Sequence, residues 1–199
     1  AEHGAKEKLV AKEGRRIIVG LDFGREPAAV FCQEDNGNWY VLSELIGRNE
    51  SAALFAPRVA RHLATEYPGF EFQAYGDPRG ADRGQADEKT AYQVFQRNGI
   101  MVIPATRDNN PQMRRSAVES VLQRRHGLKI AKRCLTLRKG MAGGYHYRKQ
   151  KGADGLFAEK PSKNLYSHVV ESFENAVLGG GEGISSINRS AHAKKAPSP

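Results

Sequence analysis

The sequence predicts an α/β protein in which helices flank a mixed β-sheet, with a basic β-hairpin inserted late in the chain. Two observations lead to this fold class. Near the start of the chain three apolar runs follow one another, and the second and third are joined by Asp35-Asn36-Gly37-Asn38, a sequence typical of hairpin turns. Farther on, helical and extended patterns alternate, as they do in chains that build a sheet from strand–helix units.

The early elements are four strands and one helix. The first strand is a continuous β-branched apolar run that ends in an acid, as a central strand does. Ser51 is a suitable N-cap for a helix that continues to about residue 67, and Pro57 inside it predicts a kink or a late start. The expected strands are 16–23, 28–33, 39–45 and 70–77.

The second half of the chain is expected to alternate helix and strand. Asp87 is a candidate cap for a helix over 88–98, which Gly99 ends. Asn110 and Pro111 open the next helix with a cap followed by a first-turn proline. The remaining elements are a strand over 100–104, a basic hairpin region and a last helix over about 167–178. This order of elements is that of a ribonuclease H-like mixed sheet.

Length and composition fit one soluble domain with tails, since the chain has 199 residues, of which 39% are hydrophobic, and a mean hydropathy of −0.60. No apolar run approaches the roughly 18 residues of a membrane span, and no basic segment followed by an apolar run resembles a secretory signal. Cys32 and Cys134 form no CxxC pair. We therefore expect a reducing compartment, no disulfide scaffold, no thiolate zinc site and no membrane partner.

The positive charge of the chain is concentrated in one stretch. The net charge is +9, yet residues 105–151 contain 13 basic residues against two acidic ones. One interpretation is a solvated helix face, and the other is a surface that follows the phosphate backbone of double-stranded DNA. The predicted DNA-binding residues are Arg114, Arg115, Arg124, Arg125, Lys132, Arg133, Arg138, Lys139, Arg148 and Lys149.

Asp22 and Asp77 end the first and fourth expected strands. These strands are neighbours in a ribonuclease H-like sheet, so the two carboxylates are expected to converge at one edge. Neighbouring carboxylates repel each other unless a hard cation lies between them, and oxygen ligands without thiolates suit Mg²⁺ or Mn²⁺. Two such ions about 4 Å apart activate a water molecule and stabilise the leaving oxygen of a phosphodiester. For either residue alone, the alternative is a turn-forming aspartate at a strand end.

A third metal ligand is expected from the last helix. Glu171 follows His168 by three residues, which places both on one side of that helix. The alternative for Glu171 is an acid that the helix dipole favours in a first turn, and Asp154 is a weaker candidate for the third ligand. The predicted catalytic and metal-binding residues are Asp22, Asp77 and Glu171, with His168 supporting them.

Three segments resemble the nuclease domain of tailed-bacteriophage terminase large subunits. They are the run 17–24, Tyr75-Gly76-Asp77-Pro78, and Pro161-Ser162-Lys163-Asn164-Leu165-Tyr166-Ser167-His168. The Lys-Asn-x-Tyr-Ser-His pattern before an acid is the most specific part, and the resemblance covers residues 15–180. It implies a ribonuclease H/resolvase-like endonuclease that cuts concatemeric viral DNA with an acidic cluster and two divalent ions. Asp22 and Asp77 match the family's first two acids, whereas the third is commonly Asp and here is Glu171.

The family's large subunit also carries an N-terminal packaging ATPase, and no GxxxxGK[ST] phosphate loop occurs in this sequence. The resemblance therefore implies a nuclease domain over 15–180, preceded over 1–14 by a linker remnant from the missing ATPase domain. Residues 181–199 are rich in Gly, Ser, Ala, Lys and Pro and are expected to form a disordered tail. The implied partners are double-stranded DNA, the ATPase domain of the same polypeptide, the portal and the small terminase subunit. The implied location is the cytoplasm of the infected bacterial host.

Three other functions stay open on sequence alone. The Glu171 departure is compatible with a non-catalytic DNA-docking or motor-regulating module whose metal site is degenerate. An Asp-x-Gly sequence after a first strand also opens actin-like ATPases, although 199 residues are too few for their second phosphate loop and nucleotide pocket. A cellular resolvase would share the chemistry but would prefer branched DNA over linear DNA.

Overall fold

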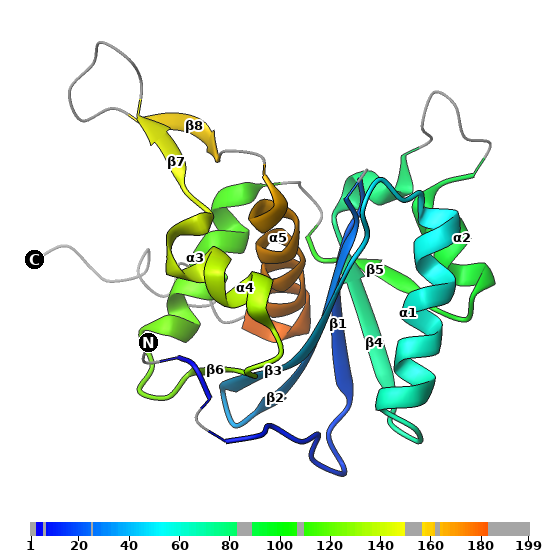
Figure 1. Cartoon of the computed structure of the whole chain (residues 1–199), viewed down its shortest axis with the longest axis horizontal. Coiled ribbons are helices and arrows are strands. Elements are labelled where there is room, and N and C mark those ends of the chain that lie inside the picture. Colours follow the sequence, from blue (N-terminus) through cyan, green and yellow to red (C-terminus); the bar gives the residue numbers. More distant parts are fainter. Residues whose placement is uncertain are drawn as a thin grey trace, which may run out of the picture.

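In the computed structural model, helices cover both faces of one six-stranded sheet (Figure 1). The residues described are 3–5, 7–24, 26–82, 89–106, 110–149, 157–161 and 164–182. The strands of the sheet are β1 (Ile17–Asp22), β2 (Ala28–Asp35), β3 (Asn38–Ile46), β4 (Phe72–Gly76), β5 (Val102–Pro104) and β6 (Leu128–Ile130). A separate two-stranded hairpin consists of β7 (Tyr147–Lys149) and β8 (Phe157–Pro161).

The six-stranded sheet is mixed, and its strands lie in the order β5-β4-β1-β2-β3-β6. β2 is antiparallel to both β1 and β3, as the predicted hairpin requires, while β4 lies parallel beside β1. β5 and β6 extend the two edges, parallel to β4 and β3. This arrangement confirms the predicted ribonuclease H-like fold class, including the adjacency of the first and fourth strands.

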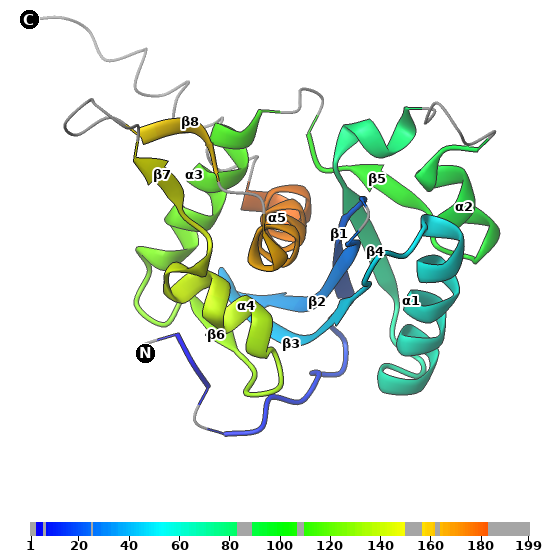
Figure 2. The ribbon, with the colours of Figure 1, turned by 45° about the horizontal axis from the view of Figure 1, so that its top comes forward.

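The helices of the described residues divide between the two faces of the sheet (Figure 2). They are α1 (Ala52–Glu66), α2 (Ala91–Arg97), α3 (Pro111–Leu122), α4 (Leu135–Lys139) and α5 (Leu165–Val177). Successive side chains of a strand point to opposite faces, so β1 contributes to two cores. Ile18 packs with α3, α4 and α5, whereas Ile17 and Val19 pack with α1 and α2. In the described part of the chain, no helix has the length and apolarity that crossing a membrane requires. Short helical segments are η1 (Pro78–Ala81), η2 (Gly140–Gly144) and η3 (Leu178–Glu182).

The helices α1 and α2 differ in detail from the sequence expectations. α1 runs unbroken through Pro57, because its apolar face is buried against the sheet along its length. α2 begins at Ala91, three residues later than expected, because Thr90 and Gln93 form a capping box there. Asp87, the expected cap, lies outside the described residues.

The N-terminal segment, expected as a linker remnant, lies along the end of the sheet that carries the β2–β3 turn (Figure 1). Gly4 forms a parallel bridge to Ile130 of β6. The Gln33 side chain accepts a hydrogen bond from the Lys12 amide at 2.8 Å and donates one to the Lys12 carbonyl at 3.0 Å. The Lys12 ammonium pairs with Asp35 at the end of β2. The segment is thus attached to the sheet at two places, whereas most of the predicted tail lies outside the described residues.

Both cysteines lie in the core between the sheet and helices α3, α4 and α5. Cys32 on β2 and Cys134 just before α4 are completely buried, and neither forms a disulfide. Burial raises the pKa of both thiols, that of Cys134 to about 12. The cysteines are therefore core residues.

Candidate active site

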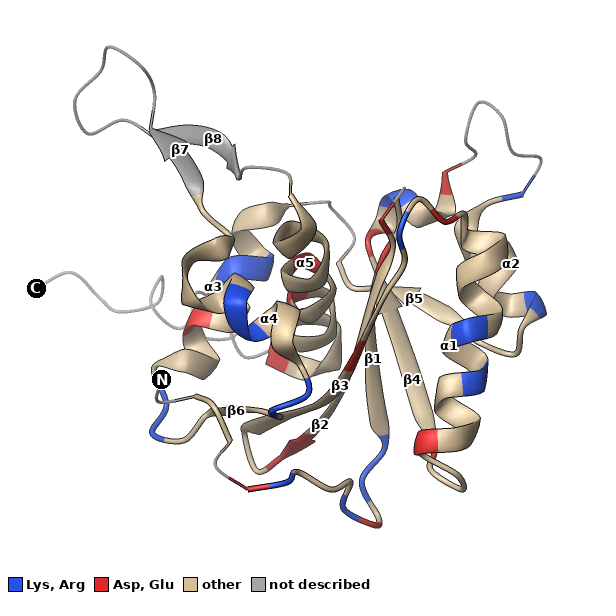
Figure 3. Cartoon of the chain, viewed as in Figure 1, with Lys and Arg blue, Asp and Glu red and all other residues tan. Residues whose placement is uncertain are grey.

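The two predicted aspartates lie at matching positions on adjacent parallel strands. In the β1–β4 register Leu21 is opposite Gly76. Asp22 follows Leu21 and Asp77 follows Gly76, so the two aspartates come at the same point of their strands. Asp22 is the last residue of β1, and Asp77 follows β4 as the cap of η1. Figure 3 shows acidic residues at these strand ends and on the adjoining helix α5.

Helix α5 lies close to β1 because Gly20 has no side chain. A β-carbon at this position would lie 1.9 Å from the carbonyl oxygen of Ser172. The Asn175 side-chain amide donates a hydrogen bond to the Leu21 carbonyl at 2.8 Å. These contacts bring the first turns of α5 to the end of β1 that carries Asp22.

The terminase-like signature builds the start of α5, two residues earlier than expected. The Asn164 side-chain oxygen accepts hydrogen bonds from the amides of Tyr166 and Ser167 at 2.9 and 3.1 Å. Its side-chain nitrogen donates to the Gly144 carbonyl at 3.0 Å, which ties the helix start to the segment before β7. Part of this sequence pattern therefore serves to cap and position α5.

His168 contacts the first aspartate directly. Its Nδ1 atom lies 2.7 Å from Asp22 Oδ2, and its Nε2 atom lies 4.0 Å from Glu26 Oε2. Asp22 is only 6% exposed, and a carboxylate that is buried to this extent requires a polar partner. The contact suits the supporting role that the sequence predicts for His168.

The second aspartate is held by two donors. Asp77 Oδ1 accepts a hydrogen bond from the Arg79 amide at 2.9 Å, and Oδ2 accepts one from Arg114 Nη1 at 3.1 Å. Arg114 also lies 3.5 Å from Glu174 Oε2 on α5 through its Nε atom. With 5% exposure, Arg114 is buried between two carboxylates, so the prediction that it contacts DNA is wrong.

Helix α5 carries two buried acids beyond His168. Glu171 and Glu174 follow His168 at successive intervals of three residues and are 6% and 3% exposed. Their carboxylates, with those of Asp22 and Asp77, are hard oxygen donors that suit Mg²⁺ or Mn²⁺. Among the described residues, however, no three carboxylate, imidazole or thiolate groups form a ready-made metal centre. The donor chemistry thus fits a hard cation, and His168 and Arg114 contact the two aspartates.

Two further arginines that were expected on a DNA-binding surface are bound within the protein. Arg124 pairs with the buried Glu182 and donates to the Gly37 carbonyl at 2.6 Å, in the β2–β3 turn. Arg133 donates to the Leu42 carbonyl and pairs with Glu66 at the end of α1. The Arg124 and Arg133 side chains are still 31% and 50% exposed, so their contact with DNA stays a prediction.

The remaining predicted DNA contacts divide between the two ends of the sheet. Arg125 and Lys132 are exposed, and Arg125 adjoins the Arg124 contact at the β2–β3 turn. Lys139 is exposed and Arg138 half-buried, and the next residue, Gly140, lies against Tyr166 of α5. Arg115 is also half-buried, beside Arg114. The side chains of Arg148 and Lys149 lie outside the described part of the chain.

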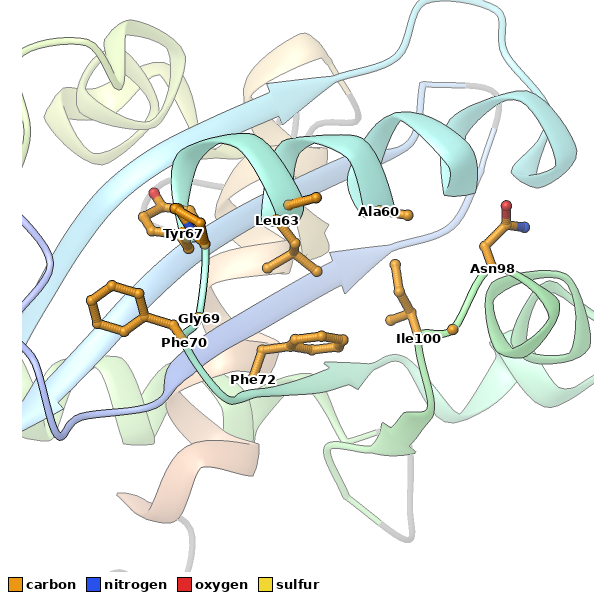
Figure 4. A pocket seen from close by; sticks show the side chains of 11 residues that line it. Ala60, Leu63, Tyr67, Gly69, Phe70, Phe72, Asn98 and Ile100 are labelled. Carbon is orange, nitrogen blue, oxygen red and sulfur yellow. The ribbon is translucent and has the colours of Figure 1, made fainter.

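A cavity of about 440 Å³ lies away from the carboxylates (Figure 4). It is formed by the last turns of α1, the turn that leads into β4, and the residues between α2 and β5. Its lining includes Leu63, Phe70, Phe72 and Ile100 and contains none of the predicted site residues. The cavity therefore lacks the acidic and basic groups that phosphodiester chemistry requires.

Comparison with known proteins identifies relatives by structure only. No protein-family profile matches the chain, and a search of curated proteins finds no match. The large terminase of a thermophilic bacteriophage has a TM-score of 0.68 at 17% identity, with 88% of this chain and 41% of that chain covered. The chain thus spans less than half the length of that large terminase.

Two isolated domains match over most of their length. The nuclease domain of the large terminase from bacteriophage SPP1, determined with bound manganese, has a TM-score of 0.61 at 15% identity, with 88% of this chain and 95% of that one covered. The nuclease domain of the P22 large terminase has a TM-score of 0.62 at 10% identity, with coverages of 89% and 87%. The chain therefore has the fold of large terminase nuclease domains.

Proposed function

We propose that this chain is the nuclease domain of a viral genome-packaging terminase, a divalent-metal-dependent endodeoxyribonuclease that cuts concatemeric double-stranded DNA. The observation that carries the proposal is the placement of Asp22 and Asp77 at matching ends of β1 and β4, beside the first turns of α5. The similarity to the SPP1 nuclease domain with bound manganese supports a metal-dependent reaction.

In this proposal Asp22, Asp77 and Glu171 hold two Mg²⁺ or Mn²⁺ ions. Bound ions of this kind generate a hydroxide from water and stabilise the leaving oxygen of a phosphodiester. His168 fixes the orientation of the Asp22 carboxylate through the 2.7 Å contact of its Nδ1 atom. The Arg79 amide does the same for Asp77, and the Asn175 bond to β1 keeps α5 in place while DNA binds.

We propose that DNA is held by its backbone through cations near the start of α5. Arg115, Arg138 and Lys139 remain candidates after the structural placement of the basic residues. Contacts to phosphates position a duplex without reading its sequence, so base preference is expected to be slight and affinity to fall steeply with salt.

The proposal also covers the longer polypeptide to which such a nuclease domain would belong. A match to 41% of a large terminase supports a chain that works beside an ATPase domain of the same polypeptide. The further proposed partners are the portal and the small terminase subunit, and the proposed place of action is the cytoplasm of an infected bacterium.

The decisive experiment is plasmid nicking and linearisation with Mn²⁺, Mg²⁺ or EDTA. We expect the wild type to cut only with metal, and Asp77→Asn and Glu171→Ala to lose about a hundredfold or more of the rate. Glu119→Gln, an exposed acid on α3, is the matched control and should retain wild-type cutting. Glu171→Asp tests whether the shorter acid supports cutting at the third position.

A non-catalytic DNA-docking module is the second candidate function. It is favoured by the observation that the described acids do not form a ready-made metal centre. Under this alternative, the chain binds linear duplex DNA with the expected salt dependence but shows no cleavage at any Mg²⁺ or Mn²⁺ concentration. Equal residual cutting by the wild type and Asp77→Asn would reveal a contaminating nuclease and favour the docking module.

A further inference from the structure

The most distinctive group beside the acids is a buried cation that belongs to the protein. Arg114 reaches from α3 to Asp77 Oδ2 at 3.1 Å and to Glu174 Oε2 at 3.5 Å. The side chains of Arg114 and Glu174 are only 6% and 3% exposed, so water screens this triad poorly. The guanidinium thus links the end of β4 to the middle of α5.

Charge balance explains why a cation is needed here. Buried carboxylates are costly unless an opposite charge or several hydrogen bonds compensate them. Arg114 is a positive partner that Asp77 and Glu174 share, and the imidazole of His168 contacts Asp22. A divalent ion at Asp77 would supply the same compensation that Arg114 already provides.

We infer that Arg114 is an internal counter-cation that competes with divalent metal for Asp77 and thereby lowers the metal affinity of the site. The inference rests on the proposed nuclease function. Arg114 and a metal ion repel each other, so metal binding at Asp77 requires Arg114 to release Oδ2 and to remain paired with Glu174. Arg114 is in this sense a positioning residue, because it acts on the metal site through Asp77.

The opposite role makes the opposite prediction. If Arg114 held Asp77 in the geometry that metal requires, its removal would weaken metal binding. If Arg114 competes, its removal strengthens metal binding by about tenfold, because an opposite charge at this range changes ionic equilibria at a carboxylate by one or more powers of ten.

The experiment measures Mn²⁺ binding by titration calorimetry, and thermal unfolding in EDTA and in Mn²⁺. Arg114→Met keeps an apolar stem of similar length without the charge. We expect it to unfold at a lower temperature in EDTA, to bind Mn²⁺ about tenfold more tightly, and to gain more from Mn²⁺ than the wild type does. The matched control is Arg124→Met, which breaks a comparable pair at the other end of α3 and should keep wild-type Mn²⁺ affinity.

A double variant keeps the test valid if Arg114→Met fails to fold. Arg114→Met/Glu174→Leu replaces both charges with apolar groups, a change that buried ion pairs often tolerate, and leaves the net charge unchanged. Tighter Mn²⁺ binding by Arg114→Met, or by the double variant where Arg114→Met fails to fold, supports the inference. Unchanged or weaker binding by that same variant overturns it.

The two proposals fail in different ways. Wild type that binds Mn²⁺ through Asp77 and cuts plasmid, together with an Arg114→Met variant of equal or weaker affinity, overturns only the role of Arg114. Absence of Mn²⁺ binding in the wild type, Arg114→Met and the double variant overturns both proposals.

Discussion

Helix α3 carries an ion pair near each end, and the two pairs are built differently. Arg124, near the β2–β3 turn, faces one carboxylate, that of Glu182. Glu182 accepts hydrogen bonds from Trp39 Nε1 and the Ser120 hydroxyl as well, at 3.1 and 3.2 Å. Arg114, at the other end, is shared between two carboxylates at longer distances.

This difference indicates that the Arg124–Glu182 pair serves stability, whereas the Arg114 pairs belong to the candidate site. At the Glu182 end, one negative charge is matched by one guanidinium and two further donors, so the network is closed. At the Asp77 end, one guanidinium, that of Arg114, is shared between the carboxylates of Asp77 and Glu174. A cation from solution that binds Asp77 only in the folded chain would therefore stabilise this end by mass action.

The largest expected effect comes from opening the closed network. Glu182→Ala leaves Arg124 and Trp39 Nε1 without their shared acceptor and should lower the free energy of unfolding by about 3 kcal/mol. Urea titration measures this loss, with Glu119→Ala at an exposed position of α3 as the control. A loss that Mn²⁺ reversed would contradict the distinction between the two ends.

The site end depends instead on the close approach of α5 to β1. Gly20→Ala places a β-carbon 1.9 Å from the Ser172 carbonyl oxygen, so α5 must move, at a cost of about 2 kcal/mol. Urea titration gives the stability, and plasmid cleavage should fall by a larger factor than in a surface variant of equal stability. In the control Gly24→Ala, the new atom meets its nearest neighbour, His168, at 3.9 Å, and stability should be retained.

The exposed cations at the two ends are expected to differ in DNA binding. Arg138→Gln/Lys139→Gln should weaken duplex binding by about tenfold and reduce the salt slope by about 2, one for each lost phosphate contact. The matched control, Arg125→Gln/Lys129→Gln, removes two exposed charges near the β2–β3 turn. Fluorescence anisotropy at several salt concentrations distinguishes them, and equal losses would show that net charge alone governs binding.

The smallest expected effect is a pH dependence of the closed network. Burial works to raise the pKa of the Glu182 carboxyl, but hydrogen bonds from Arg124 and Trp39 outweigh it and hold the pKa below its usual value. A folded-state pKa below the unfolded value, about 4.3, stabilises the protein above that pH, and the gain is lost as pH falls through the folded pKa. The stability difference between wild type and Glu182→Gln should therefore shrink from pH 7 to pH 3 in urea titrations. A difference that grew on acidification would contradict this reading of the pair.

Much of the fold follows from local sequence signals. The Asn36-Gly37 turn sets the first hairpin, and the Asn110 cap with Pro111 starts α3 as expected. The start of α2 was misplaced because Asp87 and Thr90 are both capping residues, and only Thr90 has a glutamine three positions later. α4 was not predicted, because a helix of five residues has too few turns to show a periodicity.

The part of the candidate site that depends only on the order of the strands could be predicted from the sequence. Asp22 and Asp77 end adjacent strands, and the order of elements is enough to make those strands neighbours. The involvement of Arg114 and Glu174 was not predicted, because an arginine in a basic stretch suggests a solvent-exposed residue. The signal that would have indicated it is the recurrence of His168, Glu171 and Glu174 at intervals of three, which places acids on successive turns of one helix.

Alkylation of the two buried cysteines detects local opening of the folded chain. Alkylating reagents attack thiolates, and burial together with a raised pKa keeps Cys32 and Cys134 protonated and inaccessible in the folded chain. Both thiols lie in the core beneath α3, α4 and α5, the layer that carries Arg114 and Glu171. The rate at which these thiols are modified therefore measures how often helices α3, α4 and α5 separate from the sheet that holds Asp22.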